Sequence, residues 1–513
     1  MTRSTDRLGL LFAASVTLGA CPGPYGDTDG ETASSSSGAE CPVGSLNCPC
    51  TTGKSCDGGL VCASNVCVKL DGDTSTSDAS TSLDPTTGEM STGGGDCDAN
   101  GDGGVDPACP ESQPYCVAGA CFGCAQLDCE ALSPAEPLCN EASGLCVACL
   151  CTDAKPVCDP DTHSCRVCTA HSDCPDSACD LWTGACFPAA ATLWVDVSGD
   201  CSDAGPGDPG APLCSLDAAF VRVNAASPGH QAIRVRPGSY AVKSPLRAPS
   251  DHVVALVHAT GQAGAPAVTI AAKSSAAIAI DPGGKLLVDA LRLADSGGDA
   301  IECTAGTAWL DRLTVTASSQ RGIAAEGCEL VLRRSVLFGN VIAGARLSGG
   351  SLRLENSYVS VNGNPQTGEG GIYLADGAEL DAVYSTWVDN RGQAGTPFAV
   401  ACADGDPKEK VGVRNSLAIN PGFNTLCEGA TVAHTGWSTE MAAGSNMAIA
   451  SADLAKYLKV DLDLPGVYRV IAGAGLDELG AWEQGDPAID FDGDARPAAD
   501  NAPDFAGADR VAR

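Results

Sequence analysis

The stretch Leu354-Glu-Asn-Ser357-Tyr-Val is the third of five copies of a short pattern between about Gly297 and Asn420. In each copy an aliphatic anchor precedes two variable residues, usually a hydroxyl residue, then apolar positions and a turn residue. The five anchors lie 22, 22, 29 and 30 residues apart: Leu310, Leu332, Leu354, Val383 and Val413. The last four copies each run on to an asparagine: Asn340, Asn362, Asn390 and Asn420. Such a unit is typical of one coil of a β-solenoid.

Stacked coils place like residues above one another, and each strand hydrogen-bonds to the strands above and below it. A tight corner between two strands requires a left-handed backbone, which Asn tolerates. We therefore expect corner residues at Arg334, Asn356, Ser385 and Asn415.

At these residues the sequence resembles the right-handed parallel β-helix proteins, the group that includes pectate-lyase-like folds. The resemblance covers roughly residues 193–513 and implies an all-β solenoid for this part of the chain. It says little about activity, because this scaffold hosts many functions.

Composition limits the class of protein. A chain of 513 residues is long enough for several modules. Its net charge of −34 argues against a nucleic-acid partner, which requires a basic surface. The acidic surface keeps an exported protein soluble, and recruitment of calcium is a second interpretation. The 29 cysteines indicate an oxidising compartment.

The N-terminus has the pattern of an export signal. Residues 1–20 carry Arg3 and Arg7 and then an apolar run that is too short to span a bilayer. Its end, Leu18-Gly-Ala-Cys21, resembles a bacterial lipobox. The resemblance implies that the Cys21 thiol receives a diacylglyceryl anchor, which leaves 28 cysteines to pair. An ordinary secretory signal that ends in Cys is the alternative. Pro22 favours the outer membrane by the sorting rule of such lipoproteins.

Four further segments follow in the predicted domain organisation. Residues 21–40 and 69–95 are rich in small and polar residues and are predicted to be disordered tethers. Between them, residues 41–68 hold six cysteines and form a small disulfide module whose connectivity stays open. Residues 96–188 form a cysteine-rich block, and residues 190–513 form the β-helix domain.

The cysteine-rich block is itself repetitive, with similar segments every 19 to 23 residues. Disulfides are expected to replace a hydrophobic core here, which gives a stiff spacer or an adhesive stalk. Recurring Cys-x2-Cys pairs near His163 and His171 leave zinc as an alternative.

The start of this block resembles a thrombospondin-type-3 or EF-like calcium loop. Its candidate ligands stand at alternate positions: Asp98, Asn100, Asp102 and Asp106. Position twelve is Cys109 instead of a bidentate Glu, so a plain acidic turn is the competing interpretation.

The β-helix domain should open with a cap. We predict a Cys201–Cys214 bridge, followed by a helix over 215–226 with Ser215 as its N-cap. Such a helix would cover the exposed end of the first coil. Two further bridges between neighbouring coils are predicted: Cys303 with Cys328, and Cys402 with Cys427.

The C-terminus resembles the closing signature of exported β-helix proteins. The resemblance implies that Arg496 pairs with a neighbouring carboxylate while a strand closes the last coil. Three alternating carboxylates are candidate calcium ligands, or else form a turn held by Asx hydrogen bonds: Asp490, Asp492 and Asp494.

Enzymes on this scaffold need clustered carboxylates beside an Arg or Lys base, or paired aspartates. The signatures of polygalacturonases and alginate epimerases are absent. Charged residues that could still form a catalytic cluster are Arg333, Arg334, Asp381 and Asp389, together with Arg353, Glu355 and Arg391. Alternating charges on an exposed solenoid sheet are more simply a solvated face. Insertions at 363–370, 391–397 and 404–410 should gather on one side and mark the ligand side.

Together these patterns predict a lipid-anchored, exported protein of the outer membrane or cell surface. A disulfide-rich stalk would carry a β-helix head that binds polysaccharide or another surface ligand. The alternative is a polysaccharide lyase or glycoside hydrolase, and an inert structural role is a third class. The arrangement is similar to the large cysteine-rich lipoproteins of myxobacteria. Calcium is the one cofactor indicated.

Overall fold

A computed structural model of the chain describes residues 145–511, apart from 160, 261–266, 367, 394–398, 404–409, 420–426, 428 and 438–443. Before residue 145 it describes strands β1 to β5 and a few single positions. The chain divides into two compact units, Met1–Gly93 and Gly94–Arg513. The predictions for Cys21, for the candidate calcium ligands from Asp98 to Asp106 and for Asn420 lie outside the described residues.

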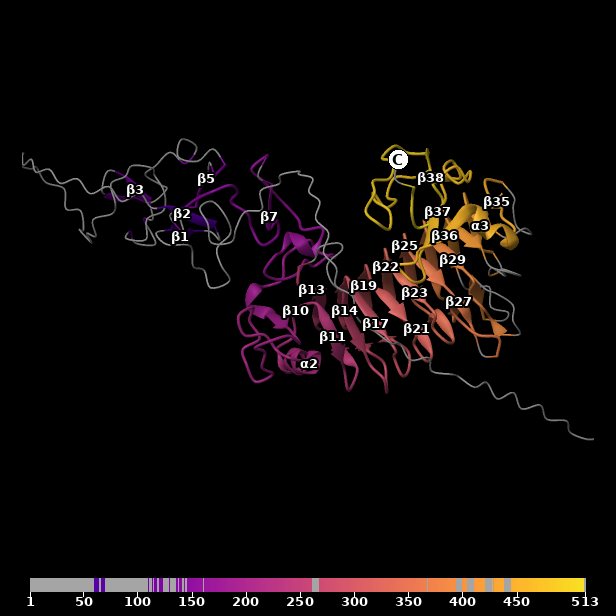
Figure 1. The fold of residues 1–513 in the computed structure, drawn as a ribbon, viewed down its shortest axis with the longest axis horizontal. Coiled ribbons are helices and arrows are strands. Elements are labelled where there is room, and N and C mark those ends of the chain that lie inside the picture. Colours follow the sequence, from indigo (N-terminus) through magenta and orange to yellow (C-terminus); the bar gives the residue numbers. More distant parts are fainter. Residues whose placement is uncertain are drawn as a thin grey trace, which may run out of the picture. The chain divides into compact units, whose positions relative to one another are not determined.

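Three long parallel sheets make up most of the second unit, and their strands alternate along the chain (Figure 1). The first sheet contains β9 (Thr192–Val195), β10 (His230–Val235), β13 (Val253–His258), β16 (Lys285–Asp289), β19 (Thr307–Asp311), β22 (Glu329–Arg333), β25 (Ser351–Glu355), β28 (Glu379–Val383), β31 (Lys410–Arg414) and β33 (Thr431–Ala433). The second contains β11 (Gly238–Ala241), β14 (Val268–Ala271), β17 (Leu291–Ala294), β20 (Thr314–Thr316), β23 (Val336–Phe338), β26 (Tyr358–Ser360), β29 (Thr386–Val388), β32 (Leu417–Ile419), β34 (Gly436–Trp437) and β35 (Met447–Ala448). The third contains β12 (Leu246–Ala248), β15 (Ile278–Ile280), β18 (Ile301–Thr304), β21 (Arg321–Glu326), β24 (Ala343–Ser348), β27 (Gly370–Ala375) and β30 (Val400–Cys402).

Most coils contribute one strand to each sheet, so the domain is the predicted parallel β-helix. Inward residues of equivalent strands stack in register and build one continuous apolar core. Leu310, for example, pairs with Leu332, which pairs with Leu354.

The register corrects the fourth copy of the sequence pattern by one residue. Leu354 pairs with Ala382, so the anchor is Ala382 and not Val383. The left-handed corner residue is accordingly Tyr384, with φ of 50°, and the prediction of a corner at Ser385 was wrong. The pattern was misread because a small residue occupies this anchor position, while the fully buried ring of Trp387 fills the core close by.

Seven left-handed residues mark the corner between the first and second sheets on successive coils. We call them the corner column: Ala290, Arg312, Arg334, Asn356, Tyr384, Asn415 and His434. The predicted corners at Arg334, Asn356 and Asn415 are thus confirmed. Next to this column, a serine ladder links the coils, because Ser357 Oγ accepts the Ser335 N–H at 3.1 Å and Ser416 Oγ accepts the Ser385 N–H at 3.0 Å.

An asparagine ladder links the coils at the next corner, between the second and third sheets. Asn362 Oδ1 accepts the backbone N–H of Asn340 at 3.1 Å and its side-chain amide at 2.9 Å. Asn390 Oδ1 accepts the corresponding groups of Asn362 at 3.1 and 3.0 Å. These asparagines are completely or almost completely buried, so their bonds replace those that water would make.

The N-terminal end of the β-helix is capped as predicted. Helix α2 (Leu216–Ala225) begins after Ser215, whose side chain accepts the Ala218 N–H. Its apolar face joins the core and covers the first coil. The three predicted bridges are present: Cys201–Cys214, Cys303–Cys328 and Cys402–Cys427.

The cysteine-rich repeats form small hairpins: β3 (Tyr115–Val117) with β4 (Ala120–Phe122), β5 (Leu138–Asn140) with β6 (Leu145–Val147), and β7 (Val157–Asp159) with β8 (Ser164–Arg166). Two cysteines face each other across each hairpin, yet the disulfides bridge to cysteines upstream, as in Cys149–Cys158 and Cys151–Cys165. Each hairpin is therefore tied to the segment before it.

A C-terminal segment, residues 450–511, follows the last coil. It contains the short helix α3 (Leu454–Tyr457) and two antiparallel hairpins, β36 (Leu458–Val460) with β37 (Tyr468–Val470) and β38 (Gly480–Trp482) with β39 (Ala502–Asp504). It lies along the side of the coils (Figure 1, yellow) and does not close the last coil, so that prediction was wrong. No helix in the described ranges has the length and apolarity needed to cross a bilayer.

We predict that Asn362→Ala lowers the free energy of unfolding by about 3 kcal/mol, because it leaves buried amide groups of the neighbouring coils without partners. Urea denaturation measures this change. The matched control is Gln320→Ala at an exposed position of the same corner region, which should change stability by no more than about 0.5 kcal/mol. Equal stabilities of the two variants would contradict a stabilising role for the ladder.

Candidate functional site

The C-terminal segment covers the outer face of the second sheet. Outward residues of the sheet form an apolar cluster with the segment: Val336, Tyr358, Val388, Leu417 and Ile419. The ring of Phe491 contacts that of Tyr358 edge to face, with centroids 5.0 Å apart. Burial of this face stabilises the segment by the hydrophobic effect.

The corner column supplies polar contacts that hold the segment in place. Asn356 Nδ2 donates to the Ile489 carbonyl at 2.8 Å. Asn415 pairs with the backbone of Ala481 in both directions, at 2.8 and 2.9 Å. Asparagine at these corners thus adopts the left-handed backbone and also hydrogen-bonds to the segment.

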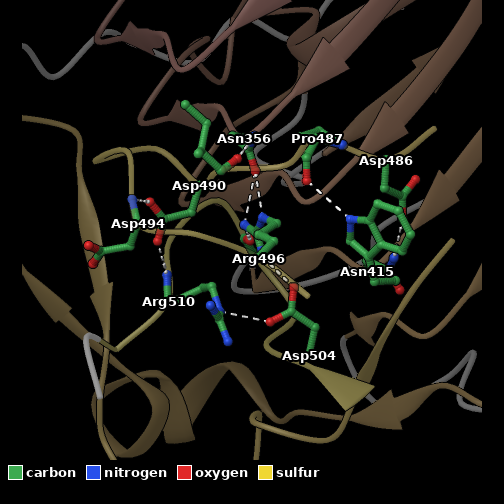
Figure 2. Close-up of polar contacts among 12 residues, drawn as sticks. Asn356, Asn415, Asp486, Pro487, Asp490, Asp494, Arg496, Asp504 and Arg510 are labelled. Atoms are coloured by element: carbon green, nitrogen blue, oxygen red, sulfur yellow. Dashed lines mark hydrogen bonds and ion pairs between the residues drawn. The ribbon is translucent and has the colours of Figure 1, made fainter. Parts of the chain in front are cut away.

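Arg496 is the most deeply buried of these contacts (Figure 2). Its guanidinium donates to Asp504 at 2.9 Å and to Asn356 Oδ1 at 3.1 and 2.9 Å, and it lies 3.7 Å from the ring centroid of Tyr384. Burial lowers the pKa of Arg496 although the carboxylate of Asp504 opposes this shift. The predicted pairing of Arg496 with a neighbouring carboxylate is confirmed, and its role is structural.

Asp490 organises the turn at one edge of the segment (Figure 2). Its Oδ1 accepts the backbone N–H groups of Asp492, Gly493 and Asp494 at 3.1, 3.0 and 2.8 Å, and its Oδ2 accepts that of Arg510 at 3.0 Å. This is the Asx-type turn that the sequence analysis weighed against calcium.

Metal-binding groups of three or more side chains occur in the described residues only among cysteines of the repeat block. They are Cys149, Cys151 and Cys165, and Cys168, Cys174 and Cys179. All six sulfurs belong to disulfides, which have no thiolate to offer zinc. The three carboxylates from Asp490 to Asp494 form no such group in the described structure.

A cleft of about 600 Å³ opens where the C-terminal segment overhangs earlier coils of the second sheet. Its floor is formed by β17, β20 and β23, with Arg292, Thr314 and Phe338 exposed to it. The facing wall consists of Asp463–Pro465 and Phe491–Gly493 of the segment.

One end of the cleft is fixed by a close backbone approach. Gly466 has φ of 90°, and a Cβ at this position would come within 2.8 Å of Phe338 Cβ. The Gly466 carbonyl accepts the Ser360 hydroxyl at 2.8 Å. Glycine is therefore needed to let the wall reach the sheet.

Two arginines of the corner column border the cleft on its other side. Arg312 Nε donates to Asp289 at 2.8 Å, and Arg334 Nε donates to Asp311 at 2.9 Å. Burial alone would lower the pKa of Arg312, but the hydrogen bonds and charge of Asp289 outweigh it and raise that pKa. Burial would likewise raise the pKa of Asp311, yet its paired arginines lower it. These side chains present fixed positive charge and are poor proton acceptors.

The predicted catalytic candidates do not meet at one site. Arg333 and Arg334 share the buried carboxylate of Asp311, with Arg333 Nη2 at 2.6 Å. Asp381 lies on the outer face of the first sheet. Asp389 is a left-handed residue directly after β29, and burial raises its pKa although Arg391 opposes the shift.

The outer face of the first sheet carries a second hollow of about 690 Å³. Arg353 and Asp381 pair there at 3.5 Å, and their side chains are 42% and 55% exposed. Arg353 also pairs with Glu355. This is the solvated charged face that the sequence analysis gave as the simpler interpretation.

Insertions do not gather on one side as expected. Those at 363–370 and 391–397 lie between the second and third sheets, whereas 404–410 lies between the third and first sheets. The cleft borders the opposite corner, between the first and second sheets. The sequence analysis did not identify four residues that line the cleft: Arg312, Phe338, Asp463 and Phe491. The sequence signals only Arg312, because it occupies the position of Arg334 one coil earlier.

Behind the cleft wall, one arginine serves three carboxylates. Arg469 Nε lies 2.9 Å from Asp461, and its Nη1 contacts both Asp492 and, at 3.2 Å, Asp509. Asp509 Oδ1 is buried and has no hydrogen-bond partner in the described structure. Burial raises the pKa of Asp509 to about 7; Arg469 opposes the shift, whereas the nearby carboxylates of Asp492 and Asp490 add to it.

Comparisons with known proteins found one matching family model and several similar solved structures. A family model described as a family of unknown function (DUF8331) matches residues 90–192, and no curated protein matches the chain. Among solved structures, a pectate lyase, Pel9A, is similar with 14% identity and a TM-score of 0.34, over 62% of this chain and 96% of the lyase. A rhamnogalacturonan lyase is similar with 12% identity and a TM-score of 0.30, over 56% of this chain and 97% of the lyase.

Protonation of Asp509 should stabilise the docked segment. Because folding raises the Asp509 pKa from 3.8 to about 7, the folded protein binds more protons than the unfolded chain between these values. The free energy of unfolding should therefore fall as the pH rises from about 4 to about 7. We predict that Asp509→Asn reduces this fall, by on the order of 2–4 kcal/mol.

Denaturation of both proteins across this pH range measures the effect, and the exposed Glu478→Gln serves as the control. If the free energy of unfolding of Asp509→Asn depends on pH as that of the wild type does, protonation of Asp509 does not cause the fall.

Proposed function

We propose that this chain is an exported, lipid-anchored surface protein whose β-helix head binds polysaccharide in the cleft between the second sheet and the C-terminal segment. The observation that carries the proposal is a cleft whose floor is built from in-register positions of successive coils. Arg292 pairs in register with Thr314, and Thr314 with Val336. A neighbouring row runs from Ala294 through Thr316 to Phe338.

A repeating floor suits a repeating ligand. Strands of adjacent coils are about 4.8 Å apart, so a linear polymer that lies along the helix axis meets an equivalent position on each coil. A compact ligand would use only one of these positions. The size of the cleft and its mixture of apolar floor and polar borders are those of ligand sites.

The bordering side chains favour binding over catalysis. A lyase needs an arginine or lysine that can accept a proton. Arg312 is held in its charged form by Asp289, and Arg334 is tied to Asp311. Ion-paired arginines of this kind orient hydroxyl and carboxyl groups, because their donors are fixed in direction.

The remaining modules fit a surface location. A disulfide-rich block without a large core can act as a stalk, and Cys21 would hold the chain to a membrane through its acyl chains. This arrangement would match the cysteine-rich lipoproteins of myxobacteria, with the outer membrane as its site. Calcium at the loop from Asp98 to Asp106 stays a prediction.

Blocking the cleft should weaken retention on polysaccharide. We predict that Thr314→Trp, at a partly exposed floor position, weakens binding at least about tenfold, because the indole would fill the path of the polymer. Affinity electrophoresis in gels that contain neutral or acidic polysaccharides measures this. Val331→Trp adds the same side chain to the outer face of the first sheet and should have no effect. A loss caused by Val331→Trp alone would move the site to the first sheet.

Lipidation can be tested by labelling with an alkyne fatty acid in a bacterial host. We expect label on the wild-type chain, none on Cys21→Ser, and release of Cys21→Ser into the soluble fraction. Membrane retention of an unlabelled Cys21→Ser chain would contradict the anchor.

A further inference from the structure

We propose that the polymer bound in the cleft is uncharged, with its sugar rings lying flat on the apolar floor, one edge on arginines and the other on carboxylates. This inference rests on the proposed function and names its ligand class. Three features carry it: the floor, the two borders and the balance of charge.

The floor is apolar where β23 meets the C-terminal segment. Val336 and Phe338 of β23 line the cleft from the sheet, and Phe491 and Val467 line it from the C-terminal segment. Sugar rings present C–H groups on their faces and hydroxyls at their edges. Contact of such a face with an aromatic or aliphatic surface removes both from water.

One border only donates hydrogen bonds. Arg312 and Arg334 line it, with Arg292 on the floor beside them, and a guanidinium has five N–H donors and no acceptor. Arg334 bonds to Asp311 through Nε and Nη2 in the described structure, which leaves its Nη1 hydrogens for a ligand. Arg292 is exposed and makes no ion pair among the described residues.

The opposite border only accepts them. Asp463 and Asp492 line it, and an ionised carboxylate has no donor. Asp463 is exposed, and the side chain of Asp492 is 44% exposed beside Arg469. A hydroxyl group both donates and accepts, so a ring with hydroxyls at both edges satisfies both borders. A carboxylate or sulfate would satisfy only the arginines and would face repulsion from the aspartates.

The charge balance also disfavours a polyanion. Three arginines and two aspartates line the cleft, and two of the arginines are already neutralised by the buried carboxylates of Asp289 and Asp311. No positive excess remains to attract an anionic chain. The net charge of −34 on the whole protein would repel it further.

The test compares polymers that differ only in charge. Methyl-esterified galacturonan is paired with its de-esterified form, and hydroxyethylcellulose with carboxymethylcellulose, and the dissociation constants for the full chain are measured by biolayer interferometry. We expect the uncharged member of a pair to bind at least about tenfold more tightly, with little change between about 20 mM and about 500 mM salt.

Tighter binding of a charged member, weakening as salt is added, would overturn the inference and leave the proposed function standing. Binding of no polysaccharide from either pair or from the wider panel would overturn both.

Two variants test which side chains contact the polymer. Asp463→Asn and Arg334→Gln should each weaken binding of the uncharged polymer by about three- to tenfold, and Arg334→Gln should fold because Arg333 still pairs with Asp311. Asp381→Asn, on the outer face of the first sheet, is the matched control and should bind as the wild type does. Equal affinities of all three variants, with unchanged melting temperatures, would show that neither Asp463 nor Arg334 contacts the ligand.

Discussion

In-register stacking of equivalent residues on successive coils is the constraint on which the rest of this structure depends. Because each strand hydrogen-bonds to the strand of the next coil, a one-residue slip would turn every inward side chain outward. The serine and asparagine ladders oppose such a slip at two corners, since their buried groups find partners in only one register. Disulfides such as Cys303–Cys328 add covalent links between neighbouring coils.

The same stacking creates the surface on which the C-terminal segment docks. The corner column presents Asn356, Tyr384 and Asn415 to the segment. On the earlier coils the same column presents Arg312 and Arg334 to the cleft. The change from amide and aromatic side chains to arginine coincides with the change from covered sheet to open cleft. The cleft thus lies where the docked segment covers the sheet incompletely.

Much of the fold could be predicted because it is local or repeats. The anchors at Leu310, Leu332 and Leu354, the N-cap at Ser215 and the paired cysteines all carry their information within a few residues or one period. The anchor at Ala382 was misplaced because small residues carry a weak periodic signal.

The candidate site could not be predicted in the same way. It depends on contacts between residues more than a hundred positions apart, such as Arg496 with Asn356. The charged residues that attracted attention in the sequence, Arg333 and Arg334, turned out to neutralise Asp311. A sequence repeat predicts which residues stack. The C-terminal segment does not repeat, so no periodic pattern predicts where it packs.

Amide hydrogen exchange of the full chain, with and without the tightest-binding uncharged polysaccharide, tests most directly whether the docked C-terminal segment forms the ligand site. The account predicts slower exchange at Asp463–Val467 and Phe491–Gly493 in the C-terminal segment and in β20 and β23 of the sheet below it. Slower exchange confined to β25 and β28 on the outer face of the first sheet, with the C-terminal segment unaffected, would contradict it.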